Sequence, residues 1–243
     1  MDMRAISTLT FDCYGTLIDW ESGIWDGLQP LLLANGSQRT RHASLEDFAK
    51  CESAIQAETP DMIYPEVLAN THARLAAQWG YKTDTTMDAR FGDFVPYWPA
   101  FPDSADALRQ LAQSFKLVIL SNVDRQSFQG SNARLGVQFD AIYTAEDVGS
   151  YKPNPANFPH MLSGLAADHQ VNQNEILHVA QSLFHDIKPA KAVDLPCAWI
   201  DRQNLEEGGS WGATAMVGDV PQPDKRFIDL QSFADWACGA KQA

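Results

Sequence analysis

Apolar residues follow two different patterns along the chain, and the change falls near residue 95. Between residues 20 and 94 they recur at helical spacing, and no run of β-forming residues interrupts them. From residue 104 onward, short apolar runs alternate with amphipathic stretches, as when strands alternate with helices. Such alternation predicts a parallel sheet that helices cover on both faces.

The first part of the chain predicts one strand, over residues 5–11, followed by three helices. The apolar positions of the first helix include Ile24, Trp25, Leu28, Leu31 and Leu32. Asn35 and Gly36 predict its C-terminal cap. Ser44 predicts the start of the second helix, and Gly80 predicts the end of the third.

A proline-rich segment, residues 96–102, cannot continue a helix and predicts the return from the helical region to the sheet. Further strands are expected over residues 117–120, 141–144, 176–180 and 197–200. We therefore expect an α/β fold with a Rossmann-like parallel sheet. Residues 1–18 and 96–243 would form this core, and residues 19–95 an inserted helical cap.

Charge and composition limit the partners of the protein. The 243 residues carry a formal net charge of −13, which disfavours nucleic acid and anionic membranes. No stretch approaches the roughly 18 apolar residues that span a bilayer, and the four cysteines follow no metal-binding spacing. We expect a cytoplasmic protein that acts on a small anionic molecule, and the aromatic cap leaves room for a homodimer.

Polar residues follow four of the predicted strands. Parallel sheets bind ligands beyond the carboxyl ends of their strands, so these side chains are expected to meet at one edge. The residues in question are Asp12 and Thr16, Ser121 and Asn122, Lys152, and the group Gln181, Ser182 and Asp186.

Four short segments carry a family resemblance. FDCYGT, LSN, YKP and SLFHD resemble, in this order, the four motifs of the haloacid dehalogenase superfamily, and the helical insert lies where that superfamily has its cap. The resemblance implies that Asp12 is a nucleophile, that Ser121 contacts the substrate, and that Lys152 neutralises and orients Asp12. We group Tyr14, Thr16 and Asn122 with Ser121 as substrate-binding residues.

Tyr14 and Gln181 distinguish between the branches of this superfamily. Its phosphatases resemble one another in having a second acid at the place of Tyr14, which protonates the leaving alcohol, and a Mg²⁺-binding acid at the place of Gln181. General acid catalysis contributes about 10²–10⁴-fold, and tyrosine, with a pKa of about 10, is a poor substitute. A phosphate dianion beside Asp12 would also be repelled, by about 4 kcal/mol for each pair of charges about 4 Å apart.

A 2-haloacid fits these residues better, because a halide leaves without a proton. The 2-haloacid dehalogenase branch is similar at the first motif, with tyrosine in the second place and no metal. The resemblance then implies (S)-2-haloacid dehalogenase-type hydrolysis, in which Asp12 displaces halide and forms an ester. Water attacks this ester, with Asp186 as the base, and no cofactor is expected.

The resemblance is incomplete, and alternatives stay open. Gln181, Leu183 and Phe158 stand where the dehalogenases resemble one another in having serine, asparagine and tyrosine. Cap residues that could grip the leaving halide are Arg39, Arg41 and Lys50. Asp186 could instead cap a helix or hold Lys152, and we expect His185 to be an exposed helical residue without chemistry. The rival functions are a Mg²⁺-dependent phosphatase and a binding protein that kept the pocket.

Overall fold

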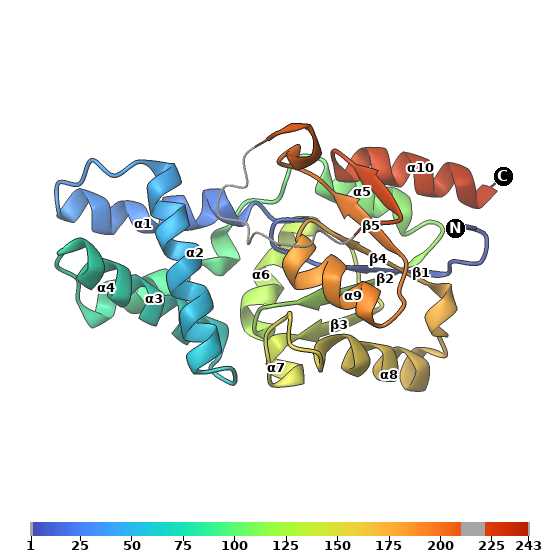
Figure 1. Ribbon diagram of the computed structural model, residues 1–243, viewed down its shortest axis with the longest axis horizontal. Helices are drawn as coiled ribbons and strands as arrows, with labels where there is room; N and C mark the ends of the chain where they lie inside the picture. The colour runs from blue at the N-terminus through green and yellow to red at the C-terminus, as the bar shows by residue number, and fades with distance from the viewer. Residues whose placement is uncertain (1, 210–221, 243) are drawn as a thin grey trace.

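The protein is built around one parallel sheet (Figure 1), seen in a computed structural model that describes residues 2–209 and 222–242. Its strands are β1 (Thr8–Phe11), β2 (Lys116–Ser121), β3 (Ala141–Thr144), β4 (Ile176–Ala180), β5 (Cys197–Ile200) and β6 (Lys225–Phe227). The order β3-β2-β1-β4-β5-β6 is parallel at every pairing and places β1 in the interior of the sheet. The expected α/β fold is confirmed.

Helices account for most of the remaining chain. They are α1 (Trp20–Ala34), α2 (Arg41–Glu58), α3 (Tyr64–Trp79), α4 (Thr85–Gly92), α5 (Ser104–Leu111), α6 (Arg125–Leu135), α7 (Ala145–Val148), α8 (Asn157–His169), α9 (Lys188–Ala192) and α10 (Leu230–Gln242). Short 3₁₀ turns are η1 (Val95–Tyr97), η2 (Gln173–Glu175) and η4 (Leu205–Glu207), and η3 (Leu183–Ile187) is a π-helical turn. None of the helices in the described ranges is long and apolar enough to cross a membrane.

The four central strands β2, β1, β4 and β5 are buried on both faces, as their continuous apolar runs predict. Alternate strand residues point to opposite faces, so Leu117 and Ile119 join the apolar cluster that includes residues of α5, α6 and α10. Val118 and Leu120 join a second cluster with residues of α8 and α9. The strands therefore have little freedom to slip, and their carboxyl ends are fixed relative to one another.

The helices α1 to α4 pack against one another beside the sheet (Figure 1), and residues 20–94 contain no strand, as expected. Asn35 caps α1, and Gly80 ends α3 in the left-handed conformation at φ 70°. The predicted start of the second helix was wrong. It begins at Arg41, because the hydroxyl of Thr40 caps it by accepting from the N–H of Ala43.

Two backbone segments connect the helical region to the sheet, and they run side by side. The N–H of Asp19 donates to the carbonyl of Pro99 at 2.8 Å, and the N–H of Phe101 donates to the carbonyl of Leu17 at 3.0 Å. The outgoing and returning chain thus pair immediately after the first motif. The division into a core and a cap at residues 18–19 and 95–96 stays a prediction.

Candidate active site

Asp12 lies directly beyond β1 and is buried, with 5% of its surface exposed. Its Oδ2 accepts a hydrogen bond from the Thr16 hydroxyl at 2.7 Å, and that hydroxyl also accepts from the N–H of Gln181 at 2.9 Å. The loop turns sharply at Gly15, whose φ of 95° favours glycine. Thr16 therefore links the nucleophile loop to the end of β4 and fixes one oxygen of Asp12.

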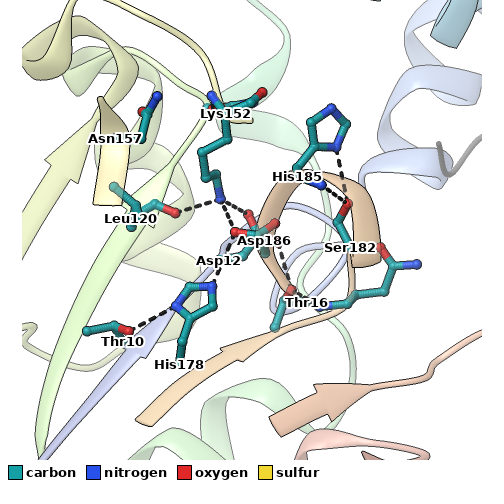
Figure 2. A network of polar contacts seen from close by, with 12 residues as sticks. Thr10, Asp12, Thr16, Leu120, Lys152, Asn157, His178, Ser182, His185 and Asp186 are labelled. Atoms are coloured by element: carbon teal, nitrogen blue, oxygen red, sulfur yellow. Dashed lines mark hydrogen bonds and ion pairs between the residues drawn. The ribbon is translucent and has the colours of Figure 1, made fainter. Parts of the chain in front are cut away.

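Lys152 lies between two carboxylates (Figure 2). Its Nζ donates to Oδ1 of Asp12 at 2.9 Å, to Oδ1 of Asp186 at 2.6 Å and to the carbonyl of Leu120 at 2.9 Å. An ammonium has three donors, so all of them are used, and the side chain is only 1% exposed. The three predicted catalytic side chains are thus in direct contact, although the motifs that carry them are far apart in sequence.

Asp186 lies in the π-helical turn after β4 and presents one free oxygen. Its Oδ1 accepts from Lys152 and faces Nε2 of His178 at 3.3 Å. Its Oδ2 is buried without a hydrogen-bond partner among the described residues, and the same is true of the hydroxyl of Ser121 at the end of β2. Unpaired buried polar atoms are costly, so these two atoms point to groups that a ligand or water satisfies.

Asn122 and Tyr14 both turn their side chains toward protein groups. The amide of Asn122 donates to the carbonyl of Lys152 at 3.0 Å and accepts from its N–H at 2.7 Å, which holds the lysine loop. The hydroxyl of Tyr14 lies 3.0 Å from that of Ser131 on α6, and its ring meets the edge of Trp98. Their predicted substrate contacts are not tested by this geometry.

Charge and burial oppose each other in the site. Burial raises the pKa of Asp12, and Asp186 raises it further, although Lys152 and the Thr16 hydrogen bond act against the rise. Burial alone would raise the pKa of Asp186 too, but Lys152 and His178 outweigh it and lower that pKa. The same two carboxylates outweigh desolvation at Lys152 and raise its pKa. Asp186 and Lys152 are therefore both charged at neutral pH.

Two residues of the fourth motif differ from expectation or were missed. His185 is partly buried, so the expectation that it is exposed was wrong; its N–H donates to the Ser182 hydroxyl, and burial lowers its pKa to about 4. His178, inside β4, was not recognised as a site residue. A single histidine in an apolar run does not identify a site residue from sequence. Its role becomes visible only when the pairing of β4 with β1 shows which side chains it faces.

The cap residues considered for halide binding are engaged elsewhere or exposed. Arg39 forms an ion pair with Asp47 and lies over the ring of Trp79 at 4.4 Å. Arg41 donates to the Ser22 hydroxyl at 3.0 Å, and Lys50 is exposed. The partners of Arg39 and Arg41, Asp47 and Ser22, belong to the helical region and not to the strand-end site.

The residues at this edge fit a divalent cation poorly. Asp12 directs one oxygen at Lys152 and the other at Thr16, which leaves Oδ2 of Asp186 as the free carboxylate oxygen of this pair. Mg²⁺ requires octahedral oxygen ligands, usually with at least one carboxylate directly bound. In the described ranges, no group of three His, Cys, Asp or Glu side chains could hold a metal ion.

Comparison with known proteins places this site in a family. A family model described as haloacid dehalogenase-like hydrolase matches residues 6–194. An (S)-2-haloacid dehalogenase from Pseudomonas putida is 26% identical over 216 residues, which cover 83% of this chain and 87% of that protein. A phosphoglycolate phosphatase from Photorhabdus laumondii subsp. laumondii is 26% identical over 234 residues, 95% of this chain and 93% of that protein.

A solved structure shows the same fold. The L-2-haloacid dehalogenase from Xanthobacter autotrophicus with chloropropionic acid covalently bound superposes with a TM-score of 0.77 at 20% identity, covering 96% of this chain and 99% of the other. The family match extends over more than half of the sequence and includes all four motifs. The chain belongs to the haloacid dehalogenase-like hydrolases.

Proposed function

We propose that the protein hydrolyses a small 2-halocarboxylic acid, most specifically an (S)-2-haloacid, through an ester on Asp12 and without a cofactor. The observation that carries the proposal is the buried ammonium of Lys152, within 2.9 Å of Asp12 and 2.6 Å of Asp186. Lys152 balances the charge of Asp186 and also favours the anion of Asp12. A monoanionic acid can turn its carboxylate away from Asp12, whereas a phosphate dianion brings its charge to the reacting atom itself.

In the first step, a carboxylate oxygen of Asp12 attacks C2 of the substrate. The new C–O bond forms as the carbon–halogen bond breaks, and the halide leaves with the bonding electrons. No proton is needed, which agrees with Tyr14, because burial raises its pKa well above 10 and makes it a weaker acid than free tyrosine. The free hydroxyl of Ser121 is available to bind the substrate carboxylate.

In the second step, water attacks the carboxyl carbon of the Asp12 ester. Oδ2 of Asp186 accepts the proton of this water, because it is the oxygen that the protein leaves free. The ester C–O bond on the Asp12 side then breaks, and the leaving alkoxide takes up the second proton of the attacking water. This gives the 2-hydroxy acid and the Asp12 carboxylate, and Asp186 returns its proton to solvent. No described residue accepts from the N–H groups of Cys13 and Tyr14, so these donors are available to the oxyanion formed during attack.

The proposal is tested by halide release and by isotope labelling in one experiment. (S)- and (R)-2-chloropropionate are incubated with the protein in chelator, and chloride is measured. With enzyme in excess in H₂¹⁸O, we expect the label in the peptide that contains Asp12 and not in the product. Label in the product alone would mean that water attacks C2 directly and would rule out the ester.

The second candidate is a Mg²⁺-dependent phosphatase, which the similarity to the phosphoglycolate phosphatase favours, since it extends over 95% of this chain. Titrating Mg²⁺ into an assay of phosphoglycolate cleavage separates the two functions. Mg²⁺-stimulated turnover without any halide release would replace our proposal. Binding of 2-chloropropionate with no label at Asp12 would instead indicate a protein that kept the pocket and lost turnover.

A further inference from the structure

His178 is the one charged or titratable side chain within β4, and it is completely buried. Its neighbours in the strand are apolar, and the strand is enclosed between β1 and β5. A buried imidazole is costly unless its nitrogens are hydrogen-bonded. What these nitrogens face therefore explains why the strand tolerates a histidine.

Both ring nitrogens of His178 have partners (Figure 2). Nδ1 lies 2.9 Å from the hydroxyl of Thr10, and Nε2 lies 3.3 Å from Oδ1 of Asp186. An ionised carboxylate only accepts hydrogen bonds, so the proton between His178 and Asp186 belongs to Nε2. In the neutral ring, Nδ1 then accepts, and the Thr10 hydroxyl is the donor. The chain of hydrogen bonds runs from Thr10 through His178 to Asp186.

The sheet holds this arrangement rigidly. Thr10 and His178 are register partners across the β1–β4 pairing, so backbone hydrogen bonds fix the distance between their side chains. The ring of Phe158 packs edge-on against the imidazole at 5.0 Å and 80°. Rotation of the imidazole would break both hydrogen bonds and this contact, so the ring presents Nε2 at one position.

We propose that His178 is a positioning residue that orients Asp186 for the hydrolysis of the ester. The proposal rests on the function proposed above, in which Asp186 accepts the proton of water. Lys152 and His178 both donate to Oδ1 of Asp186, and two donors on one oxygen fix the carboxylate plane. They also leave Oδ2 as the free oxygen that faces the reaction.

Loss of the His178 side chain is expected to affect ester formation and ester hydrolysis differently. Ester formation depends on Asp12, Lys152 and Thr16, whereas the ring nitrogens of His178 face Thr10 and Asp186. Ester hydrolysis depends on Asp186. Loss of the His178 donor should therefore slow hydrolysis and leave formation nearly unchanged, so that the ester accumulates.

The test compares His178→Leu, which removes the donor, with His178→Gln, which keeps an N–H donor. Each step is timed with enzyme in excess over (S)-2-chloropropionate, by following the mass of the Asp12 peptide after rapid acid quenching. A positioned base contributes about 10²–10⁴-fold, so losing its orientation should cost part of this. We expect His178→Leu to slow ester decay about 10- to 100-fold with ester formation within about 3-fold of wild type.

Rescue and control variants separate positioning from general damage to the fold. His178→Gln should recover most of the decay rate, Thr10→Val should lose part of it, and Thr10→Ser, which keeps the hydroxyl, should match wild type. His72 is an equally buried histidine that bonds Asp88 in the helical region at 2.6 Å. His72→Leu should reduce stability without changing the ratio of the two rates.

The proposal is overturned if His178→Leu slows both steps equally, or if His178→Gln is as slow as His178→Leu. Long-range ¹H–¹⁵N correlation spectra of the wild-type protein provide a measurement that does not depend on turnover or on a foldable variant. We expect His178 to carry its proton on Nε2, and a proton on Nδ1 alone would contradict the proposed orientation. Absence of any ester in the wild-type protein would refute the proposed function. The position of the His178 proton would still test the hydrogen bond between His178 and Asp186.

Discussion

The site at the sheet edge and the aromatic group formed by Tyr64, Trp98 and Tyr151 differ in the kind of side chain that they bury. At the sheet edge, the buried ammonium of Lys152 lies within hydrogen-bond distance of the carboxyl groups of both Asp12 and Asp186. Toward the helical region, Tyr64 contacts Trp98 and Tyr151, its hydroxyl donates to Glu52 at 2.7 Å, and no arginine takes part in these contacts. The ionisable groups of the site thus come from the loops and the turn that follow β1, α7 and β4, whereas the group formed by Tyr64, Trp98 and Tyr151 is aromatic.

Trp98 connects the two regions. Its ring makes T-shaped contacts with Tyr14 of the nucleophile loop, with ring centroids 5.3 Å apart, and with Tyr64 of α3, with ring centroids 6.4 Å apart. Changes at the sheet edge should therefore affect the reaction strongly, while changes on the aromatic side should affect stability and pH response. The predictions below test this difference, from the largest effect to the smallest.

Removing the nucleophile should abolish activity. Asp12→Asn removes the oxygen that attacks C2, and we expect halide release to fall by about 10⁴-fold or more. Asp84→Asn alters a carboxylate that caps α4 in the helical region and serves as the matched control. Chloride release at wild-type rates from Asp12→Asn, or a comparable loss in Asp84→Asn, would contradict the assignment.

Removing the central cation should destabilise the fold as well as the reaction. Lys152→Met leaves two buried carboxylates without their partner, and breaking a buried pair in this way costs about 3–5 kcal/mol of unfolding free energy. The loss should be larger at pH 7 than at pH 5, because the raised pKa of Asp12 favours uptake of a proton as the pH falls. Urea unfolding at both pH values measures it.

The double variant Lys152→Met with Asp186→Asn is the control for this prediction. It removes one of the two unpaired charges, so it should recover part of the stability at pH 7 while remaining inactive. An equal loss at pH 5 and pH 7 would show that packing, and not charge, explains the effect of Lys152→Met.

Displacing the indole of Trp98 should lower the unfolding free energy by an intermediate amount. A Cβ added to Gly23 in α1 would lie 2.2 Å from Cγ of Trp98, so Gly23→Ala forces the indole to move. Overpacking of this kind costs about 1–3 kcal/mol. Gly239→Ala in α10 meets no atom within 4 Å and should instead stabilise the protein by up to about 1 kcal/mol. Thermal unfolding of the two variants, side by side, measures the contrast.

Glu52 should give the smallest effect, seen in the pH dependence of stability. Burial raises its pKa from 4.5 to about 7, although the hydrogen bond from Tyr64 opposes the rise. The folded protein therefore binds this proton more tightly than the unfolded chain, and stability falls as the pH rises from about 4.5 to about 7.

Glu52→Gln should flatten the dependence of the melting temperature on pH in this window. Glu58 is exposed, pairs with Arg74 and has a lowered pKa, so Glu58→Gln should leave the slope above pH 5 unchanged. An unaltered slope in Glu52→Gln would show that folding does not raise the pKa of this carboxyl.

Much of the core could be predicted because its strands are short apolar runs, and β1, β4 and β5 are buried on both faces. The runs at residues 141–144, 176–180 and 197–200 match β3, β4 and β5 in the structure. β6 was missed because its sequence, KRF, is short and polar at the edge of the sheet. α4 was missed for a similar reason, since only Phe91 and Gly92 are buried in it.

Site residues that follow predicted strands could be found from the sequence. Contacts that depend on how two strands align with each other could not. Asp12, Lys152 and Asp186 were expected together, and they are in contact. The link between His178 and Thr10 depends on how β1 aligns with β4, which neither segment specifies alone. The attachment of Asn122 to the Lys152 backbone likewise requires two loops to meet across the sheet.

The paired crossings at residues 17–19 and 99–101 have a mechanical consequence. Leu17 and Asp19 are hydrogen-bonded to the returning chain, so the helical region is attached to the sheet by two paired segments. A rotation of the helical region would have to twist both segments together. The outgoing segment begins next to Thr16, whose hydroxyl donates a hydrogen bond to Asp12. A movement of the helical region relative to the sheet would therefore act on the segment that fixes Asp12, and a foreign helical region grafted onto this sheet would need both connecting segments transplanted together.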